Sequence, residues 1–557
     1  MSLMRKSGVP TAAIVVAVAA LAGGLLGQGV GALGPGDRVE SDRITERYRI
    51  FTAALASVEN DYVVELDSSE LVYGSIDGML RTLDPHSSFL DPKAYTQMRE
   101  RQEGVYYGLG LSIVTVNDDI TVVNLFEGTP AYRAGIRRGD VIAIVKGKSA
   151  KGWTTEQAVK ELRGPKGTSV EISIRRLDQL IPLTVERDEI NITTVRTAFM
   201  IAPGTGYIRL QDFSETTDRE VGAALTKLRG EGMQRLVLDL RDNPGGPLDQ
   251  AIAVSNRFLK RGQMIVYTRG RVQNSDEDYL ATEQGDTKTP LIVLVNRNSA
   301  SASEIVTGAI QDHDRGLVVG EATFGKALVQ SVYRISNGAG LALTTGRYHT
   351  PSGRLIQRPW DGTFDEYLTY SQRDQPETRE HAAKELKYTD AGRKVYGGGG
   401  IEPDHFKPGP VEGFNPTRFS RQILARGLFV GFAEGFTAEG DTRPGSASEA
   451  KHKVARGFAV TPAILAEFAQ YVAQQQRGKV DTAALTADAA FISAMIHFEV
   501  DLDLFGVEEA RRNLSKVDPQ AQFALTFFDE AQRLIGSGTP PASPTGTPSG
   551  TKTGKTP

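Results

Sequence analysis

A forty-residue stretch near the middle of the chain, residues 291–330, most constrains its fold. It begins with a short apolar run at 291–296, which is typical of a buried strand. Small residues follow, and apolar residues then recur on one face of a predicted helix that begins near Ser301. Two further apolar segments, 316–321 and 329–335, predict strands. The pattern therefore predicts a strand–helix–strand unit with a serine at its first corner.

A serine at such a corner is a candidate nucleophile. Free backbone N–H groups at a helix N-terminus can hold a developing anion, but the hydroxyl is weak without a base. Lys326 follows 25 residues later; to accept a proton at neutral pH its pKa must fall by about 3 units, about 4 kcal/mol, which burial can achieve. Gln330 could hold the amine by a hydrogen bond. Taken singly, a serine before a helix is usually an N-cap, and a lysine beside a glycine is usually a solvated loop residue.

The whole pattern is more specific than its parts. The segments SASASE (299–304) and TFGKALVQ (323–330) closely resemble the carboxy-terminal processing (tail-specific) proteases, a family of serine–lysine peptidases. The resemblance covers roughly residues 45–410. It implies that Ser301 is the nucleophile, Lys326 the general base and Gln330 the residue that orients the base. The chain departs from the family pattern at Ala327-Leu328, where members commonly carry Gly and a small polar residue.

Strand and helix signals alternate from residue 197 to about residue 410, which predicts a largely parallel sheet with helices over it. The turn DNPGG (242–246) follows a buried strand in this region. The resemblance implies that the N–H groups of Gly246 and Ala302 form an oxyanion hole, in which losing one donor costs on the order of 3 kcal/mol. It also implies a multidomain α/β fold with a crotonase- or ClpP-like protease core at residues 188–411.

Residues 97–187 resemble a PDZ domain, inserted before the core. The segment YGLG (107–110) precedes an alternating strand, and GTPAYRAGIRRGDVI (128–142) is the usual turn, short helix and strand. In such a domain the glycines expose N–H groups to the carboxylate of a peptide, which adds as a strand. The expected peptide-binding residues are Gly108, Leu109, Gly110, Leu111, Val159 and Leu162. A packing module without a ligand is the other interpretation.

Arg163 lies where the predicted PDZ domain turns back toward the protease half. We hypothesise that it couples peptide binding to the catalytic site. The simpler interpretation is a solvated surface arginine.

The N-terminal segment, residues 1–36, predicts export. Two basic residues precede a long uncharged stretch with an apolar centre at 11–26, as in a secretory signal or an uncleaved membrane anchor. Either one places the remainder outside the cytoplasm, for example in a periplasm. A buried helix of a soluble protein is the alternative.

The segment 42–96 is predicted to be helical. Some relatives use similar helices to dimerise, so a homodimer or higher oligomer is a candidate assembly, and packing on the chain itself is the other. Asp84 and His86, near its end, could pass for a catalytic pair, but Asp84-Pro85 is typical of a turn.

The C-terminal part divides into a helical region at 412–535, without an assigned function, and a Gly/Ser/Thr/Pro-rich tail at 536–557 that is expected to be disordered.

The amino-acid composition excludes several kinds of site. The absence of cysteine removes disulfides, thiolate metal sites and cysteine nucleophiles. The seven histidines are scattered without close ligand pairs, so we predict no metal and no cofactor. A net charge of −4 gives no reason to expect nucleic acid.

These patterns together predict an exported or membrane-anchored serine endopeptidase. Its expected substrates are polypeptides with free, apolar C-termini. Two alternatives remain from the sequence. One is a catalytically silent PDZ protein that only binds peptides, which the intact Ser301, Lys326 and Gln330 disfavour. The other is a crotonase-like acyl-CoA enzyme, which the PDZ-like insertion and the export signal disfavour.

Overall fold

The computed structural model describes residues 35–536 apart from gaps at 127, 177–178, 273–274, 361–363, 371–380, 410–416, 438–453 and 477–480. The predicted export segment and the predicted disordered tail therefore lie almost wholly outside the described residues. Across the part of the chain that is described, no helix combines the length and the apolar character needed to span a bilayer. The chain divides into two compact units, residues 1–82 and 83–557.

The first unit contains two helices, α2 (Pro35–Asp61) and α3 (Ser68–Leu80). Asp67 caps α3 by accepting a hydrogen bond from the Ser69 N–H at 2.6 Å. Apolar side chains of α2, among them Tyr48 and Phe51, are exposed in this chain.

The second unit is organised around a six-stranded sheet with the order β10-β11-β12-β15-β16-β21. The edge strand β10 is antiparallel to its neighbour, and the other five strands are mutually parallel. Central strands such as β15 are continuous apolar runs because both faces of the sheet are covered. The strands are β10 (Val195–Ala202), β11 (Thr205–Leu210), β12 (Arg235–Asp239), β15 (Leu291–Val295), β16 (Leu317–Gly320) and β21 (His405–Phe406).

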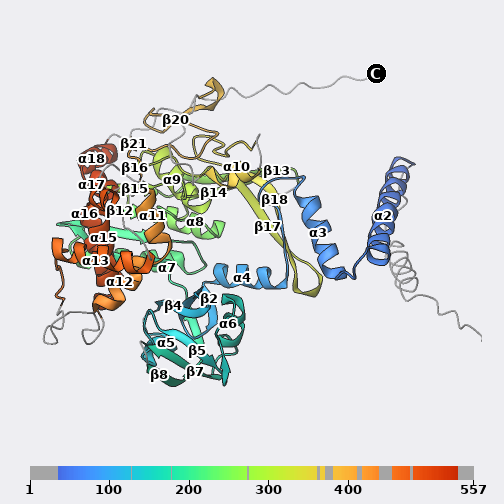
Figure 1. Cartoon of the computed structure of the whole chain (residues 1–557). Helices are drawn as coiled ribbons and strands as arrows, with labels where there is room; N and C mark the ends of the chain where they lie inside the picture. The colour runs from blue at the N-terminus through green and yellow to red at the C-terminus, as the bar shows by residue number, and fades with distance from the viewer. Residues whose placement is uncertain are drawn as a thin grey trace, which may run out of the picture. The chain divides into compact units, whose positions relative to one another are not determined.

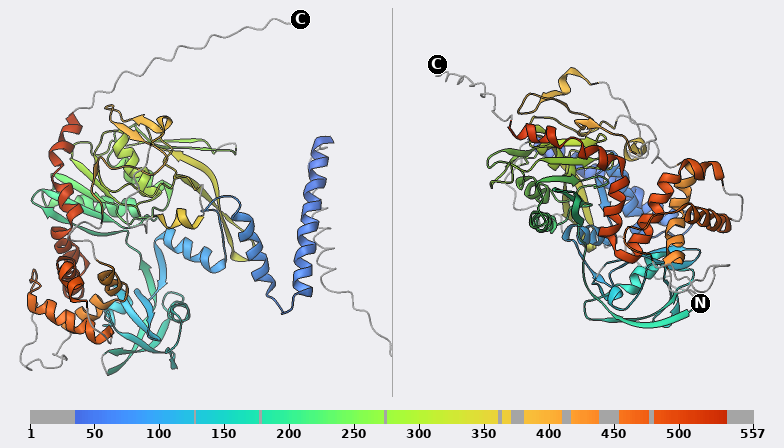
Figure 2. Two further views of the ribbon diagram at one scale, coloured as in Figure 1. Left: turned by 45° about the horizontal axis from the view of Figure 1, so that its top comes forward. Right: turned by 90° about the vertical axis from the view of Figure 1, so that its left-hand side faces the viewer.

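Different helices cover the two faces of this sheet. Helices α7 (Thr217–Gly230), α8 (Leu248–Asn256) and α9 (Ala302–Asp312) contribute to one hydrophobic core. On the opposite face, α17 (Pro519–Leu525) and α18 (Phe528–Gly536) supply Ala521, Ala524 and Phe528 to a second core. Both figures show these C-terminal helices running alongside the central sheet (Figures 1 and 2). Helices α17 and α18 are therefore part of the core built around this sheet.

A second, five-stranded sheet has the order β1-β18-β13-β14, with β17 paired to β18. Both β1 and β17 pair with β18, and Gln330 of β17 contacts the segment before β1, because its Nε2 donates to the His86 carbonyl at 2.5 Å. The strands are β1 (Ser88–Leu90), β13 (Met264–Gly270), β14 (Glu277–Leu280), β17 (Leu328–Arg334) and β18 (Gly340–His349). Smaller elements nearby are α10 (Phe364–Leu368), β19 (Leu386–Tyr388) and β20 (Lys394–Tyr396).

The PDZ region is a separate small β-rich body with its own hydrophobic core. Its sheet has the order β3-β4-β5-β7-β8, with β6 on β5, and β2 pairs with β9 to close its base. Helix α6 begins with a capping box between Thr154 and Gln157. The elements are α4 (Pro92–Glu103), β2 (Val105–Gly108), β3 (Leu111–Val116), β4 (Asp119–Leu125), α5 (Pro130–Arg133), β5 (Val141–Val145), β6 (Lys148–Ser149), α6 (Thr155–Leu162), β7 (Ser169–Arg176), β8 (Gln179–Glu186) and β9 (Asp188–Asn191).

The C-terminal region before α17 forms a helical bundle with a core of stacked aromatic rings, such as Phe429 on Phe468 at 4.9 Å. The predicted PDZ domain contacts this bundle through Arg138, whose guanidinium donates to Glu499 at 2.6 Å and to Asp503 at 3.4 Å. The helices are α11 (Arg418–Ala425), α12 (Leu428–Thr437), α13 (Pro462–Gln476), α14 (Thr482–Ala487), α15 (Ala489–Phe505) and α16 (Val507–Val517).

Candidate active site

Ser301 lies at the corner between β15 and α9, as the residue that immediately precedes the helix. Its backbone has φ 54° and ψ −113°, a region that costs a non-glycine residue about 1–3 kcal/mol. Neighbouring hydrogen bonds hold this conformation. The carbonyl of Asn243 accepts from the Ala300 N–H and from the Ser303 hydroxyl, both at 3.0 Å. The strained corner presents the serine at the N-terminus of a fully buried helix.

Lys326 and Gln330 contact each other. Lys326 lies in the loop between β16 and β17, and its Nζ donates to Gln330 Oε1 at 3.2 Å. Gln330 Nε2 donates in turn to the carbonyl of His86 at 2.5 Å, so the amide oxygen faces the lysine. Burial lowers the pKa of Lys326, against the opposing charges of Glu304 and Asp84. Burial therefore makes Lys326 easier to deprotonate than a lysine in water.

The backbones of Ser301 and Lys326 are held together by two side chains. The Tyr348 hydroxyl is within hydrogen-bond reach of both carbonyls, that of Ser301 at 3.2 Å and that of Lys326. The buried carboxylate of Glu304 accepts from the N–H of Ser301 at 2.8 Å and from the N–H of Lys326 at 2.9 Å. No direct hydrogen bond joins Ser301 Oγ to Lys326 Nζ among the contacts of the described residues.

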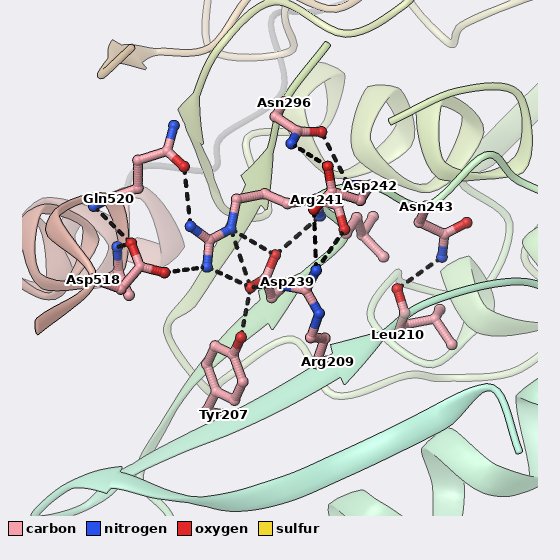
Figure 3. Close-up of polar contacts among 12 residues, drawn as sticks. Tyr207, Arg209, Leu210, Asp239, Arg241, Asp242, Asn243, Asn296, Asp518 and Gln520 are labelled. Atoms are coloured by element: carbon pink, nitrogen blue, oxygen red, sulfur yellow. Dashed lines mark hydrogen bonds and ion pairs between the residues drawn. The ribbon is translucent and has the colours of Figure 1, made fainter. Parts of the chain in front are cut away.

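The turn at 242–246 lies against the nucleophile corner. The buried side chain of Asn243 shapes it, donating to the Leu210 carbonyl at 2.8 Å (Figure 3) and accepting from the Gly245 N–H at 2.9 Å. Within the described residues, neither the Gly246 N–H nor the Ala302 N–H has a hydrogen-bond partner. The oxyanion role of these two N–H groups stays a prediction.

Gly245 packs directly against Ser301, and the sequence analysis did not single it out. A Cβ added there would lie 2.8 Å from Ser301 Cβ and 2.7 Å from the Ala302 nitrogen, and the residue has φ 94°. Only glycine fits such a position without displacing the neighbouring backbone. The GG pair in the sequence was the signal, but it did not reveal which glycine faces the serine.

A buried ionic network anchors the strand end that leads into this turn. Arg241 donates to Asp239 at 2.7 Å, and it reaches α17, forming an ion pair with Asp518 at 2.7 Å and a hydrogen bond with Gln520 at 3.0 Å (Figure 3). Although burial opposes it, Arg241 and Arg209 hold the pKa of Asp239 well below its usual range. The start of helix α17 therefore contacts the residue immediately before the 242–246 turn.

The DPHS segment (84–87) also belongs to the site. Asp84 Oδ1 accepts from the N–H groups of His86 and Ser87 at 2.8 and 2.9 Å, which is the turn that Asp84-Pro85 predicts. His86 Nε2 pairs with the Tyr367 hydroxyl at 2.9 Å, and burial together with Lys326 lowers the His86 pKa to about 4. The imidazole is therefore neutral, and the backbone of this turn orients Gln330. Sequence reasoning found the turn but not this role.

A groove of about 240 Å³ in the PDZ domain contains four of the predicted peptide-binding residues, Leu109, Leu111, Val159 and Leu162. Tyr106, Ser112, Ile113 and Arg163 complete its lining. Gly108 and Gly110 do not line the groove but flank Leu109 in the loop that enters β3, where Gly110 has φ 80° and packs against Thr129.

Arg163 is not a free surface arginine. Its guanidinium donates to Glu100 on α4 at 2.5 Å and lies 4.7 Å from the centre of the Tyr106 ring. It therefore contacts both the groove and helix α4.

Across the described residues, no group of three or more His, Cys, Asp or Glu side chains is arranged to hold a metal ion.

Comparison with known proteins adds a family context. The model of peptidase family S41 matches residues 204–363, and the PDZ domain model matches residues 97–175. A carboxy-terminal-processing protease of Bartonella bacilliformis is 41% identical over 308 residues, which span 54% of this chain and 70% of that protein. A probable CtpA-like serine protease of Staphylococcus aureus is 32% identical over 352 residues, spanning 62% of this chain and 68% of that protein. The solved structure of a photosystem II D1 C-terminal processing protease is 33% identical, covers 54% of this chain and 82% of its own, and has a TM-score of 0.31.

Proposed function

This chain belongs to the carboxy-terminal-processing proteases of peptidase family S41, and we propose that it is a serine endopeptidase that uses Ser301 and Lys326. The observation that carries the proposal is the Lys326–Gln330 hydrogen bond beside a strained serine at a helix N-terminus. A lysine held by a neutral amide, with a pKa lowered by burial, is suited to accept a proton.

The proposed reaction uses the groups already described. Neutral Lys326 removes the proton from Ser301 Oγ as the oxygen attacks the peptide carbonyl. The N–H groups of Gly246 and Ala302 stabilise the oxyanion. The lysine then protonates the leaving amine, an acyl-enzyme forms at Ser301, and water releases the product. Gln330 keeps the amine in place without adding a charge that would raise its pKa.

The PDZ groove is proposed to capture the free C-terminus of the substrate. Its apolar lining by Leu109, Leu111, Val159 and Leu162 suits an apolar terminal side chain. The edge of β3 is the strand to which a peptide would add, and the loop at Gly108 and Gly110 is the proposed site for its carboxylate. Arg163, which contacts the groove and α4, is proposed to transmit occupancy of the groove to the protease core.

We also propose that the protease domain works outside the cytoplasm, because a basic flank and an apolar segment begin the sequence. Fractionation of cells, followed by an alkaline wash of the membranes, tests this. Recovery of the protein in the cytoplasmic fraction would contradict the proposal.

Two substitutions test the catalytic assignment. Purified Ser301→Ala and Lys326→Ala are expected to lose more than about 1,000-fold of the cleavage rate on an unfolded polypeptide such as casein. The exposed residues Ser336 and Lys288 provide matched controls, and Ser336→Ala and Lys288→Ala are expected to cleave like the unmodified protein. Cleavage by Ser301→Ala at the unmodified rate would refute the mechanism.

Two further measurements test the proposed nucleophile and the capture of the substrate C-terminus. A serine-directed fluorophosphonate should label Ser301, which the alternative of a silent peptide-binding protein does not predict. Val159→Asp places a charge in the groove, so it should slow cleavage of a substrate with an apolar C-terminus and leave unchanged the cleavage of the same substrate with a charged C-terminus. Equal effects on both substrates would contradict capture through the groove.

A further inference from the structure

Glu304 is a completely buried carboxylate in the first turn of α9, with a relative exposure of 0%. It accepts four hydrogen bonds. Its Oε2 binds the N–H groups of Ser301 at 2.8 Å and of Lys326 at 2.9 Å. Its Oε1 binds the N–H of Gly325 at 2.7 Å and the hydroxyl of Thr323 at 2.5 Å. One side chain thus connects the segment of the proposed nucleophile to the segment of the proposed base.

We propose that ionised Glu304 is a positioning residue that sets the Ser301 corner and the Lys326 loop in the arrangement that the reaction requires. The inference rests on the proposed Ser301–Lys326 mechanism. The nucleophile and the base are 25 residues apart and lie on different elements, so their relative placement depends on such cross-links. A misplacement of about 1 Å can cost about 100-fold in rate.

The ionised form is required because every group that faces the two oxygens is a donor. A carboxylate only accepts hydrogen bonds, so it can satisfy all four. A protonated carboxyl group, or the amide of a glutamine, would turn a hydrogen toward an N–H or an O–H. Losing an acceptor in a buried site leaves those donors unpaired. Loss of the carboxylate should disturb Ser301 most, because the hydrogen bond from its N–H to Glu304 holds a residue in the strained conformation with φ 54°.

The titratable groups around Glu304 make this arrangement sensitive to pH. Burial raises the pKa of Glu304 to about 7, although its hydrogen bonds oppose the shift. The charged or titratable neighbours are Lys326, Tyr348 of β18 and Tyr367 of α10, while Asp84 acts on Lys326. Burial raises the pKa of both tyrosines, so they stay neutral at physiological pH.

Two ionisations therefore limit activity on the acid side. Glu304 loses its proton as pH rises through about 7, and Lys326 must also be neutral to act as a base. Both changes increase activity as pH rises. The logarithm of kcat/KM should fall on the acid side with a slope that exceeds that of a single ionisation.

Glu304→Gln is the first test. It should lower kcat by about 100-fold with little change in KM, and its acid limb should lose the ionisation near pH 7. Ser301→Ala, measured alongside, separates this inference from the proposed function. If Ser301→Ala is inactive while Glu304→Gln keeps the unmodified kcat and pH profile, the positioning role alone is overturned. If Ser301→Ala is active, both are overturned.

A matched pair at Thr323 provides a test that does not change Glu304 itself. The Thr323 hydroxyl lowers the pKa of Glu304 by its hydrogen bond. Thr323→Val removes that bond and should move the acid limb of kcat/KM to higher pH, with activity recovered in alkaline buffer. Thr323→Ser keeps the hydroxyl and should leave the limb in place. An unshifted limb in Thr323→Val, or equal shifts in the two variants, would overturn the inference.

Discussion

Removal of the Asp518 side chain should loosen the C-terminal helices from the protease core. Asp518 has two contacts that can be separated. Its carboxylate pairs with Arg241 at 2.7 Å, where the two side chains are 20% and 9% exposed. It also caps α17 by accepting from the N–H groups of Gln520 at 3.0 Å and Ala521 at 3.1 Å. Asp518→Ala removes both contacts.

The expected loss of stability in Asp518→Ala depends on the partners that Arg241 keeps. Breaking a buried ion pair typically costs about 3–5 kcal/mol, but Arg241 keeps Asp239 at 2.7 Å and Gln520 at 3.0 Å, so we expect about 2 kcal/mol here. Loss of the N-cap adds about 1 kcal/mol. Asp518→Asn keeps the cap and removes only the charge, so it should cost about 2 kcal/mol.

Hydrogen exchange of peptides from α17 and α18 measures this local opening better than global unfolding, because a multidomain chain does not unfold in one step. Asp518→Ala should speed exchange about 100-fold and Asp518→Asn about 30-fold. Asp481 provides a control, because it caps the exposed end of α14 with one hydrogen bond at 2.9 Å. Asp481→Ala should speed exchange in α14 only about fivefold. Equal exchange in the unmodified protein and in Asp518→Ala would refute the reasoning.

Two further substitutions test the active site. Gln330→Glu places a negative charge at the position that contacts Lys326 Nζ at 3.2 Å. The charge should raise the pKa of the lysine and move the acid limb of kcat/KM to higher pH by about 1 unit or more. An unchanged pH profile would argue against Lys326 as the base. Gly245→Ala places a methyl group 2.8 Å from Ser301 Cβ and should lower kcat by about 100-fold. Gly262→Ala has a similar backbone strain, φ 86°, with nothing within 4 Å, so it should cost only stability, about 1 kcal/mol; equal loss of activity in both glycine variants would show that strain alone is responsible.

Local patterns in the sequence were sufficient for much of the protein. Apolar runs predicted β12, β15 and β16, because strands buried on both faces consist mainly of apolar residues. The resemblance assigned the chain to a protease family with a PDZ domain, and the family comparisons confirm both. The candidate nucleophile, base and orienting glutamine came from one short stretch. Lys326 and Gln330 are only four residues apart, and the structure brings their side chains into contact.

Other features depended on contacts between distant segments. His86 and Gln330 are 244 residues apart, and Arg241 and Gln520 are 279 residues apart, yet each pair is joined by a hydrogen bond. No periodicity or spacing specifies such partners, since each residue alone is an ordinary turn, strand end or helix cap. Glu304 was visible as the last residue of SASASE, but only the folded chain shows that four donors from two segments meet at its carboxylate. The sequence by itself determined which elements form and which residues are candidates for the chemistry, because local propensity and side-chain type are properties of neighbours in the chain. The tertiary structure alone decided how the nucleophile and base segments are linked and that the last helices complete the core, because burial and hydrogen bonding across the fold depend on where distant segments meet.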